Sequence, residues 1–145
     1  MRLAETIASD GASSVVAVVT NGNGEILLGK STDSDHRNGK WCFTGGGIKS
    51  KEITIEQSAE RECWEESGLH CRATGIIQYG NGFEVPPSVV FVLCLADAAS
   101  NIRHNKEFSE MKWALPSDAL AWPDLFAPNR RIIERLLDHP LMEGA

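Results

Sequence analysis

Three glutamates, Glu62, Glu65 and Glu66, are spaced so that together they could hold a metal ion. Separations of three and four residues place them within an arc of about 100° on one face of a helix. Like charges at these separations repel each other by about 0.2–0.5 kcal/mol per pair. A helix that carries this trio is therefore either well solvated on that face or bound to a cation.

The apolar residues of the same helix favour the cation. Ile55, Ala59 and Cys63 form a row with a separation of four residues, and this row projects close to Glu62 and Glu66. The acids thus border the surface that should pack on a sheet, where carboxylates need a cation or hydrogen bonds. Because these are oxygen ligands with no softer group among them, we expect Mg2+, with Mn2+ as an alternative.

A run of three glycines, Gly45-Gly46-Gly47, comes shortly before this helix. We expect it to end a strand and to form part of a loop whose bare backbone can approach a metal or a phosphate closely. It is not a P-loop, because no Gly-Lys-Ser/Thr follows. The glycines and the carboxylates together indicate metal-assisted chemistry on a phosphate.

The two features form one longer motif. Gly46-x5-Glu52, followed by R-E-C-W-E-E-S-G-L at 61–69, resembles the Nudix box, G-x5-E-x7-R-E-U-x-E-E-x-G-U. Two positions depart from it: eight residues separate Glu52 from Arg61, with Ile53 as the extra one, and Thr44 stands where Pro is common. The resemblance implies an α/β fold, a Nudix-type α/β/α sandwich with a mixed β-sheet. It also implies hydrolysis of a nucleoside diphosphate linked to another moiety, as in a nucleoside triphosphate, a nucleotide sugar or a dinucleoside polyphosphate.

The resemblance also implies roles for individual residues. Glu62, Glu65 and Glu66 would ligate Mg2+, together with the carbonyl oxygen of Gly45. Arg61 and Glu52 would complete the catalytic set as structural members, with Arg61 orienting the acids.

Two later acids are candidates for a further base or metal ligand. Glu107 and Glu110 precede Trp113 in the sequence, and Glu110 is included in the expected metal set. An ordinary surface position is the alternative for each.

Substrate contacts are expected from five other side chains. Lys30, Arg37 and Lys40 surround the loop before the glycines and could hold phosphates, although they could equally be surface cations. Tyr79 and Phe83 flank a Gly-Asn-Gly turn and could stack on a base, with core packing or anchoring of the loop as the alternative.

The elements that would position these residues follow a mixed order, which argues for a mixed sheet with helices packed on it. Thr54 and Gln57 form a potential capping box, and Gly68 can end the helix that it starts. The predicted elements are strands at 14–20, 25–30, 41–44, 71–79, 88–96 and 112–114, and helices at 54–67, 117–120 and from about 129 to Pro140.

Length and composition set the limits of the interpretation. A chain of 145 residues suits one domain, so we expect a single Nudix domain over 1–145. A net charge of -6 argues against duplex nucleic acid as a partner, and no apolar run approaches the ~20 residues of a membrane helix. Four cysteines without a C-x-x-C pair, and no signal-peptide core, indicate a cytoplasmic protein with reduced thiols. The expected partner is a small nucleotide, and the resemblance adds a possible homodimer.

Two other functions are alternatives to hydrolysis. A non-catalytic, nucleotide-sensing Nudix-like domain would be favoured by missing helical acids, but all three are present. Isomerase chemistry on an isoprenoid diphosphate would need a further catalytic Cys and Glu, which the sequence does not place.

Overall fold

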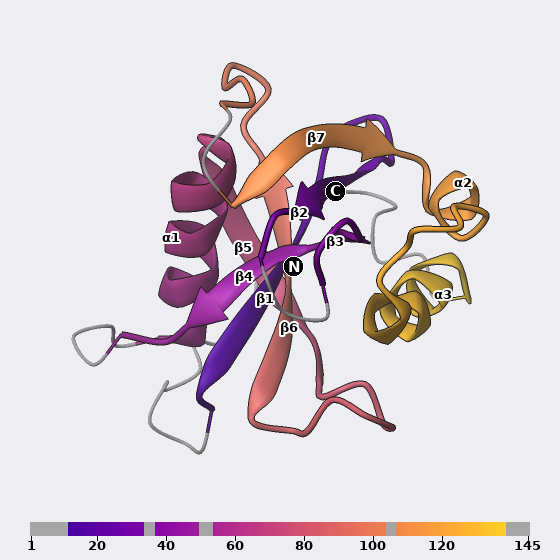
Figure 1. Ribbon diagram of the computed structural model, residues 1–145. Helices are drawn as coiled ribbons and strands as arrows, with labels where there is room; N and C mark the ends of the chain where they lie inside the picture. The colour runs from indigo at the N-terminus through magenta and orange to yellow at the C-terminus, as the bar shows by residue number, and fades with distance from the viewer. Residues whose placement is uncertain (1–11, 34–36, 50–53, 104–106, 139–145) are drawn as a thin grey trace.

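A mixed sheet of seven strands lies between one long helix and two shorter ones in the computed structural model (Figure 1). The structure describes residues 12–33, 37–49, 54–103 and 107–138. Glu52, Ile53 and Pro140 lie outside these ranges. The elements are β1 (Ser14–Thr20), β2 (Ile26–Ser31), β3 (Trp41–Cys42), β4 (Thr44–Gly47), α1 (Ile55–Ser67), β5 (Cys71–Tyr79), β6 (Val89–Ala96), β7 (Phe108–Ala114), α2 (Pro116–Ala119), a 3-10 turn (Ala127–Asn129) and α3 (Arg130–Asp138).

Strand β1 organises the sheet. It pairs with β6 in parallel along its whole length and, on its other edge, with β4 and β2 in antiparallel. The first half of β1, Ser14 to Ala17, pairs with β4, whereas Thr20 pairs with Ile26 of β2. β2 and β4 therefore diverge from one edge of β1, and β7 and β3 extend the sheet beyond β2.

The alternation of side chains along β1 explains the two helical layers. Val15, Ala17 and Val19 lie in the core that includes Ala59 and Cys63 of α1. Val18 lies in the opposite core, which is formed with Ile132, Ile133 and Leu136 of α3. The α/β/α sandwich expected from the sequence is thus present.

Helix α1 has the ends that its sequence predicts. The Thr54 hydroxyl accepts a hydrogen bond from Gln57 N at 3.1 Å, and Thr54 N donates to Gln57 Oε1 at 3.2 Å. Gly68 ends the helix in the left-handed region, at φ 75°. Both ends are fixed by contacts within a few residues, which is why the sequence sufficed to predict them.

Other boundaries differ from expectation. The three glycines do not form a loop: they continue as strand β4, because Gly45 and Gly46 pair with Val16 and Val15. Strand β7 begins at Phe108 instead of residue 112, because its whole length pairs with β2. Helix α2 begins at Pro116 and has no side-chain cap, and the closing helix begins at Arg130 after the 3-10 turn.

Two further observations concern the described residues. The four cysteines are free, as expected: Cys42, Cys63 and Cys94 are buried, and Cys71 is partly buried. None of the helices in the described part of the chain is long and apolar enough to cross a membrane.

Candidate active site

The carboxylates of α1 meet the glycine strand β4. Glu62 and Glu66 are buried, with only 7% and 6% of their surfaces exposed, and Glu66 Oε1 accepts a hydrogen bond from Gly45 N at 2.7 Å. The Glu62 carboxylate lies directly against Gly46, where a Cβ atom would come within 2.7 Å of Glu62 Cδ. Gly46 is thus needed because a side chain there would occupy the space of the Glu62 carboxylate.

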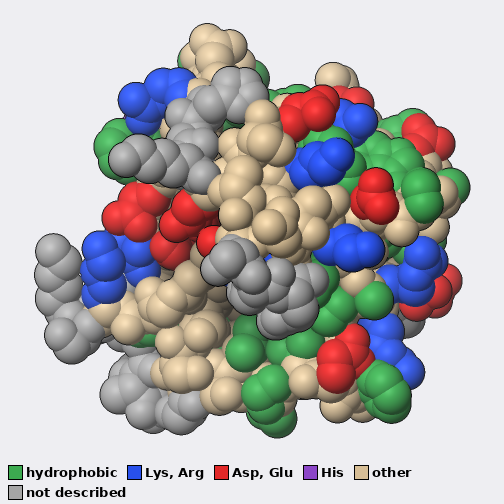
Figure 2. Space-filling model, viewed as in Figure 1, with side chains coloured by type: hydrophobic (Ala, Val, Ile, Leu, Met, Phe, Trp, Pro, Cys, Tyr) green, Lys and Arg blue, Asp and Glu red, His purple; other side chains and the backbone are tan. Residues whose placement is uncertain are grey.

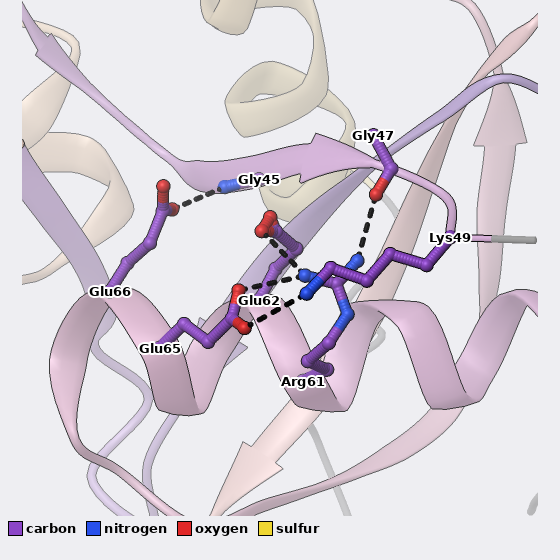
Figure 3. Close-up of polar contacts among 7 residues, drawn as sticks. All are labelled: Gly45, Gly47, Lys49, Arg61, Glu62, Glu65 and Glu66. Carbon is purple, nitrogen blue, oxygen red and sulfur yellow. Dashed lines mark hydrogen bonds and ion pairs between the residues drawn. The ribbon is translucent and has the colours of Figure 1, made fainter. Parts of the chain in front are cut away.

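Arg61 ties the helix to the same strand. Its Nη1 donates to Glu62 Oε1 at 3.0 Å and to Glu65 Oε1 at 2.8 Å, and its Nη2 donates to Gly47 O at 2.8 Å (Figure 3). The guanidinium fork can make these three bonds at once because its donors are fixed in one plane. The orienting role of Arg61 stays a prediction, and these three contacts support it.

Glu65 is the outermost of the three acids. Its side chain is 40% exposed, and its second oxygen, Oε2, lies 3.5 Å from Lys49 Nζ. Figure 2 shows acidic side chains gathered over α1 beside basic side chains at the end of β4. The site therefore combines two buried acids, Glu62 and Glu66, with an accessible charged rim formed by Glu65 and Lys49.

Burial raises the pKa values of the two buried acids, Glu62 and Glu66. Desolvation raises the pKa of Glu66 well above its usual range, and a hydrogen bond with the Glu107 side chain adds to this effect. Desolvation also raises the pKa of Glu62, although Arg61 opposes the shift. For Glu65, desolvation acts in the same direction but is outweighed by the hydrogen bond and the charge of Arg61 and by Lys49, so its pKa is lowered.

The donor set fits a hard divalent cation. It consists of carboxylate and backbone oxygens, and two buried carboxylates side by side become stable as anions when a cation compensates their charge. Among the described residues, no three acidic, His or Cys side chains converge as a ready-made metal cluster. In this arrangement Arg61 donates to Oε1 of both Glu62 and Glu65, and Gly45 N donates to Oε1 of Glu66, so one oxygen of each carboxylate already accepts a hydrogen bond from the protein.

Of the two later acids, the structure brings Glu107 to the cluster. Its side chain hydrogen-bonds that of Glu66, and its charge acts on Glu62. Glu110 pairs with Lys30 across β7 and β2, and strand alternation puts it on the same side as Lys112. Lys112 stacks on Trp41, which belongs to the core on the α3 side of the sheet. Glu110 lies on that same side, so it faces away from α1.

The predicted substrate-binding residues are spread over the molecule. Lys30 lies on the α3 side of the sheet with Glu110, and Lys40 is partly buried in the segment before β3. Arg37 forms an ion pair with Asp33 and lines a cavity next to the glycines. Tyr79 and Phe83 are both exposed, and Arg131 stacks on the Phe83 ring, with 5.3 Å from Cζ to the centroid.

That cavity has a volume of about 290 Å³ and contains a residue that the sequence did not single out. Asn129 is 5% exposed, and its Oδ1 accepts a hydrogen bond from Phe43 N at 3.1 Å. Because the Asn129 oxygen already accepts this bond, Asn129 would present its side-chain NH2 group, a donor, to a ligand. Its sequence neighbourhood, at the start of a helix, offers no sign of this position. The cavity is also lined by Ser14, Val15, Val16, Arg37, Cys42, Phe43, Phe126 and residues 44–47.

Comparison with known proteins accords with this arrangement. A family model described as the NUDIX domain matches residues 11–136. A MutT protein from Methanosarcina mazei Go1 is 25% identical, with a TM-score of 0.72 over 88% of this chain and 94% of that one. An ADP-ribose pyrophosphatase from Streptococcus suis 89-1591 is 20% identical, with a TM-score of 0.65 over 87% and 90% of the two chains.

A third structure contains ligands. It is a bifunctional NMN adenylyltransferase/ADP-ribose pyrophosphatase from Francisella tularensis, complexed with AMP and a manganese ion. It is 17% identical, with a TM-score of 0.58 over 86% of this chain and 40% of that one. A search of curated proteins gave no match. Since the family model covers most of the sequence, including the glycine strand and the carboxylate helix, the chain belongs to the Nudix family and is a Nudix hydrolase.

Proposed function

We propose that this protein is a Mg2+-dependent pyrophosphohydrolase that cleaves a nucleoside diphosphate linked to another moiety. The observation that carries the proposal is the approach of the α1 carboxylates to β4: Glu66 accepts from Gly45 N, and Glu62 lies against Gly46. Nudix hydrolases in general use divalent metal ions, and all three helical acids that the family's motif requires are present.

The groups proposed to hold the cation are Glu62, Glu65, Glu66 and the Gly45 carbonyl. Gly45 N points to Glu66 and away from β1. The N–H and C=O of one strand residue point to the same side, so the carbonyl oxygen of Gly45 also faces the helix. Mn2+ is an alternative to Mg2+, because both prefer oxygen ligands.

Hydrolysis of a diphosphate requires both neutralisation of its negative charge and an activated water molecule as the nucleophile. A bound divalent cation would neutralise the diphosphate and lower the pKa of a water molecule that attacks phosphorus. Arg61 keeps Glu62 and Glu65 in position through its bond to Gly47 O. Glu107 is better placed than Glu110 to accept or hold a proton, since its side chain already shares a hydrogen bond with Glu66.

The cavity beside β4 supports a nucleoside as part of the substrate. It adjoins Gly45 and Gly46, so a base bound there would leave its phosphates next to the carboxylates. Phe126 offers an apolar wall, and Asn129 offers an amide donor to an acceptor on the base. Nucleoside triphosphates, nucleotide sugars and dinucleoside polyphosphates share this recognition element. The neighbours described as MutT and as ADP-ribose pyrophosphatases accord with small nucleotides of these kinds.

Activity on a panel of nucleotides, with Mg2+ or Mn2+, tests the proposal. We expect release of phosphate or pyrophosphate or of a nucleoside monophosphate by the parent, and a loss of about 100-fold or more in kcat for Glu65→Gln with the fold intact. If the Glu65→Gln variant were as active as the parent, Glu65 would be removed from the mechanism. Tight binding of one nucleotide without turnover would favour the nucleotide-sensing alternative. The single domain over 1–145, the cytoplasmic location and the homodimer stay predictions.

A further inference from the structure

Lys49 occupies an unusual place at the rim of the site. It follows β4 by two residues, and its side chain runs back between β4 and α1 to Glu65, which projects from α1 (Figure 3). The distance from Lys49 Nζ to Glu65 Oε2 is 3.5 Å, and the lysine side chain is 50% exposed. Lys49 therefore reaches the acid cluster from the solvent side.

The two oxygens of Glu65 contact two different basic side chains. Oε1 accepts from Arg61, which is also bonded to Glu62 and to Gly47 O, whereas Oε2 faces Lys49. Arg61 is thus fixed by two bonds within α1 and one bond to β4. An exposed lysine ion pair contributes little to stability, so the Lys49 contact is the one that can be exchanged at small cost.

The charges of the cluster make such an exchange useful. Arg61 contacts Glu62 and Glu65, and Lys49 contacts Glu65, so both cationic side chains meet at Glu65. If Glu65 Oε2 turns to a divalent cation, the contact between Lys49 and Glu65 is lost, while Lys49 remains beside the site. A diphosphate bound there brings new negative charge to the place that Lys49 already reaches.

We propose that Lys49 is a phosphate-binding residue that is held by Glu65 until a divalent cation binds, and that it then contacts the diphosphate of the substrate. The inference rests on the proposed function, because it needs the same cation site. It assigns Lys49 two opposite effects: Lys49 competes with the cation for Glu65, and it strengthens binding of the phosphates. A purely structural lysine would not have effects of opposite sign.

The test measures two binding constants on the full chain. Mn2+ is titrated first without a nucleotide, and inorganic pyrophosphate is then titrated at saturating Mn2+. For Lys49→Gln we expect Mn2+ to bind about threefold more tightly, as suits the loss of an exposed competing charge. We expect pyrophosphate to bind about tenfold or more weakly, as suits the loss of a charge-assisted hydrogen bond.

Two further variants complete the design. Lys49→Arg keeps the charge and should behave like the parent in both titrations. Arg72→Gln is the control and removes the same charge from β5. Arg72 pairs with Leu95 of β6, which pairs with Thr20 at the end of β1. The glycine strand, by contrast, ends beside Ser14 at the start of β1, so Arg72 lies far from Lys49. Arg72→Gln should also leave both constants within about twofold of the parent values, since exposed charges more than a Debye length of about 10 Å apart are largely screened.

The outcomes separate the two proposals. If the parent binds no Mn2+, the proposed function fails, and this inference fails with it. If the parent binds Mn2+ and pyrophosphate but Lys49→Gln has unchanged or weaker Mn2+ binding, or unchanged pyrophosphate binding, only the role of Lys49 is overturned.

Discussion

Glu66 shows how one side chain can serve opposite needs of stability and function. It is buried on α1, yet it keeps a hydrogen bond from Gly45 N and another with the Glu107 side chain. A buried carboxyl group that shares a proton with a second carboxyl is stable in its neutral form. The same oxygens become strong ligands once a cation compensates their charge.

This arrangement predicts how the metal-free protein responds to pH. The folded-state pKa of Glu66 is raised above the unfolded value of 4.5, so the stability from its protonated form is fully present below pH 4.5 and is lost as the pH rises through the folded pKa. Glu66→Gln keeps a neutral group there and avoids this loss. We expect the variant to unfold at a higher temperature than the parent at pH 8 in EDTA, with the difference shrinking toward pH 4.5.

The comparison is made by thermal unfolding across this pH range. Addition of Mn2+ should reverse the order at pH 8, because only the parent has the full set of anionic ligands. A parent that is as stable as Glu66→Gln at every pH in EDTA would show that Glu66 is not held protonated.

At the level of elements, two neighbouring glycines of strand β4 have different surroundings: Gly45 lies against β1, and Gly46 lies against helix α1. A Cβ atom on Gly45 would lie 2.5 Å from Val15 O, on the backbone of β1. On Gly46 it would meet the end of the Glu62 side chain, which can move. The first glycine is therefore required for strand pairing, and the second leaves room for the carboxylate.

This division predicts three different outcomes for the same substitution. Gly45→Ala should lower the free energy of unfolding by about 1–3 kcal/mol, because backbone atoms must shift. Gly46→Ala should stay within about 1 kcal/mol of the parent but displace Glu62, so that Mn2+ affinity falls about tenfold or more. Gly22→Ala, in the turn between β1 and β2, has no atom within 4 Å of the new Cβ and should change neither property.

Urea unfolding and a Mn2+ titration provide the two measurements. Equal Mn2+ affinity in Gly46→Ala and Gly22→Ala would mean that Glu62 does not need its position against Gly46.

In the molecule as a whole, the site is assembled from segments that are distant in sequence. The main chain at Glu107 is anchored by a hydrogen bond from Thr32 N to Glu107 O of 2.9 Å, next to the β2–β7 pair. This pairing carries residue 107 to the carboxylates of α1, whereas Glu110 emerges on the other face of the sheet, beside Lys30. Two acids three residues apart thus have different surroundings.

The two acids can be distinguished by matching substitutions. Glu107→Gln should lower kcat by about 100-fold or more if Glu107 handles a proton in the reaction, whereas Glu110→Gln should stay within about threefold of the parent. Steady-state kinetics with the preferred nucleotide, at several pH values, provides the measurement. A larger loss in Glu110→Gln than in Glu107→Gln would return Glu110 to the metal set.

Much of this protein follows from contacts between near neighbours in the sequence. The capping box at Thr54, the left-handed Gly68 and the four-residue period of Ile55, Ala59 and Cys63 define α1, and its Glu spacing defines the acidic face. These features depend on hydrogen bonds and side-chain periods within one or two helical turns, so they can be deduced before any tertiary contact is known.

Other features arise from pairing across long distances. The glycines become a strand because β1 accepts them on its edge, Glu107 reaches Glu66 because β7 joins β2, and Asn129 meets Phe43 across 86 residues of sequence. Each of these contacts depends on which strands lie side by side and on which face a side chain emerges. A shift of a single residue in strand pairing would reverse the faces, and no local spacing fixes that choice.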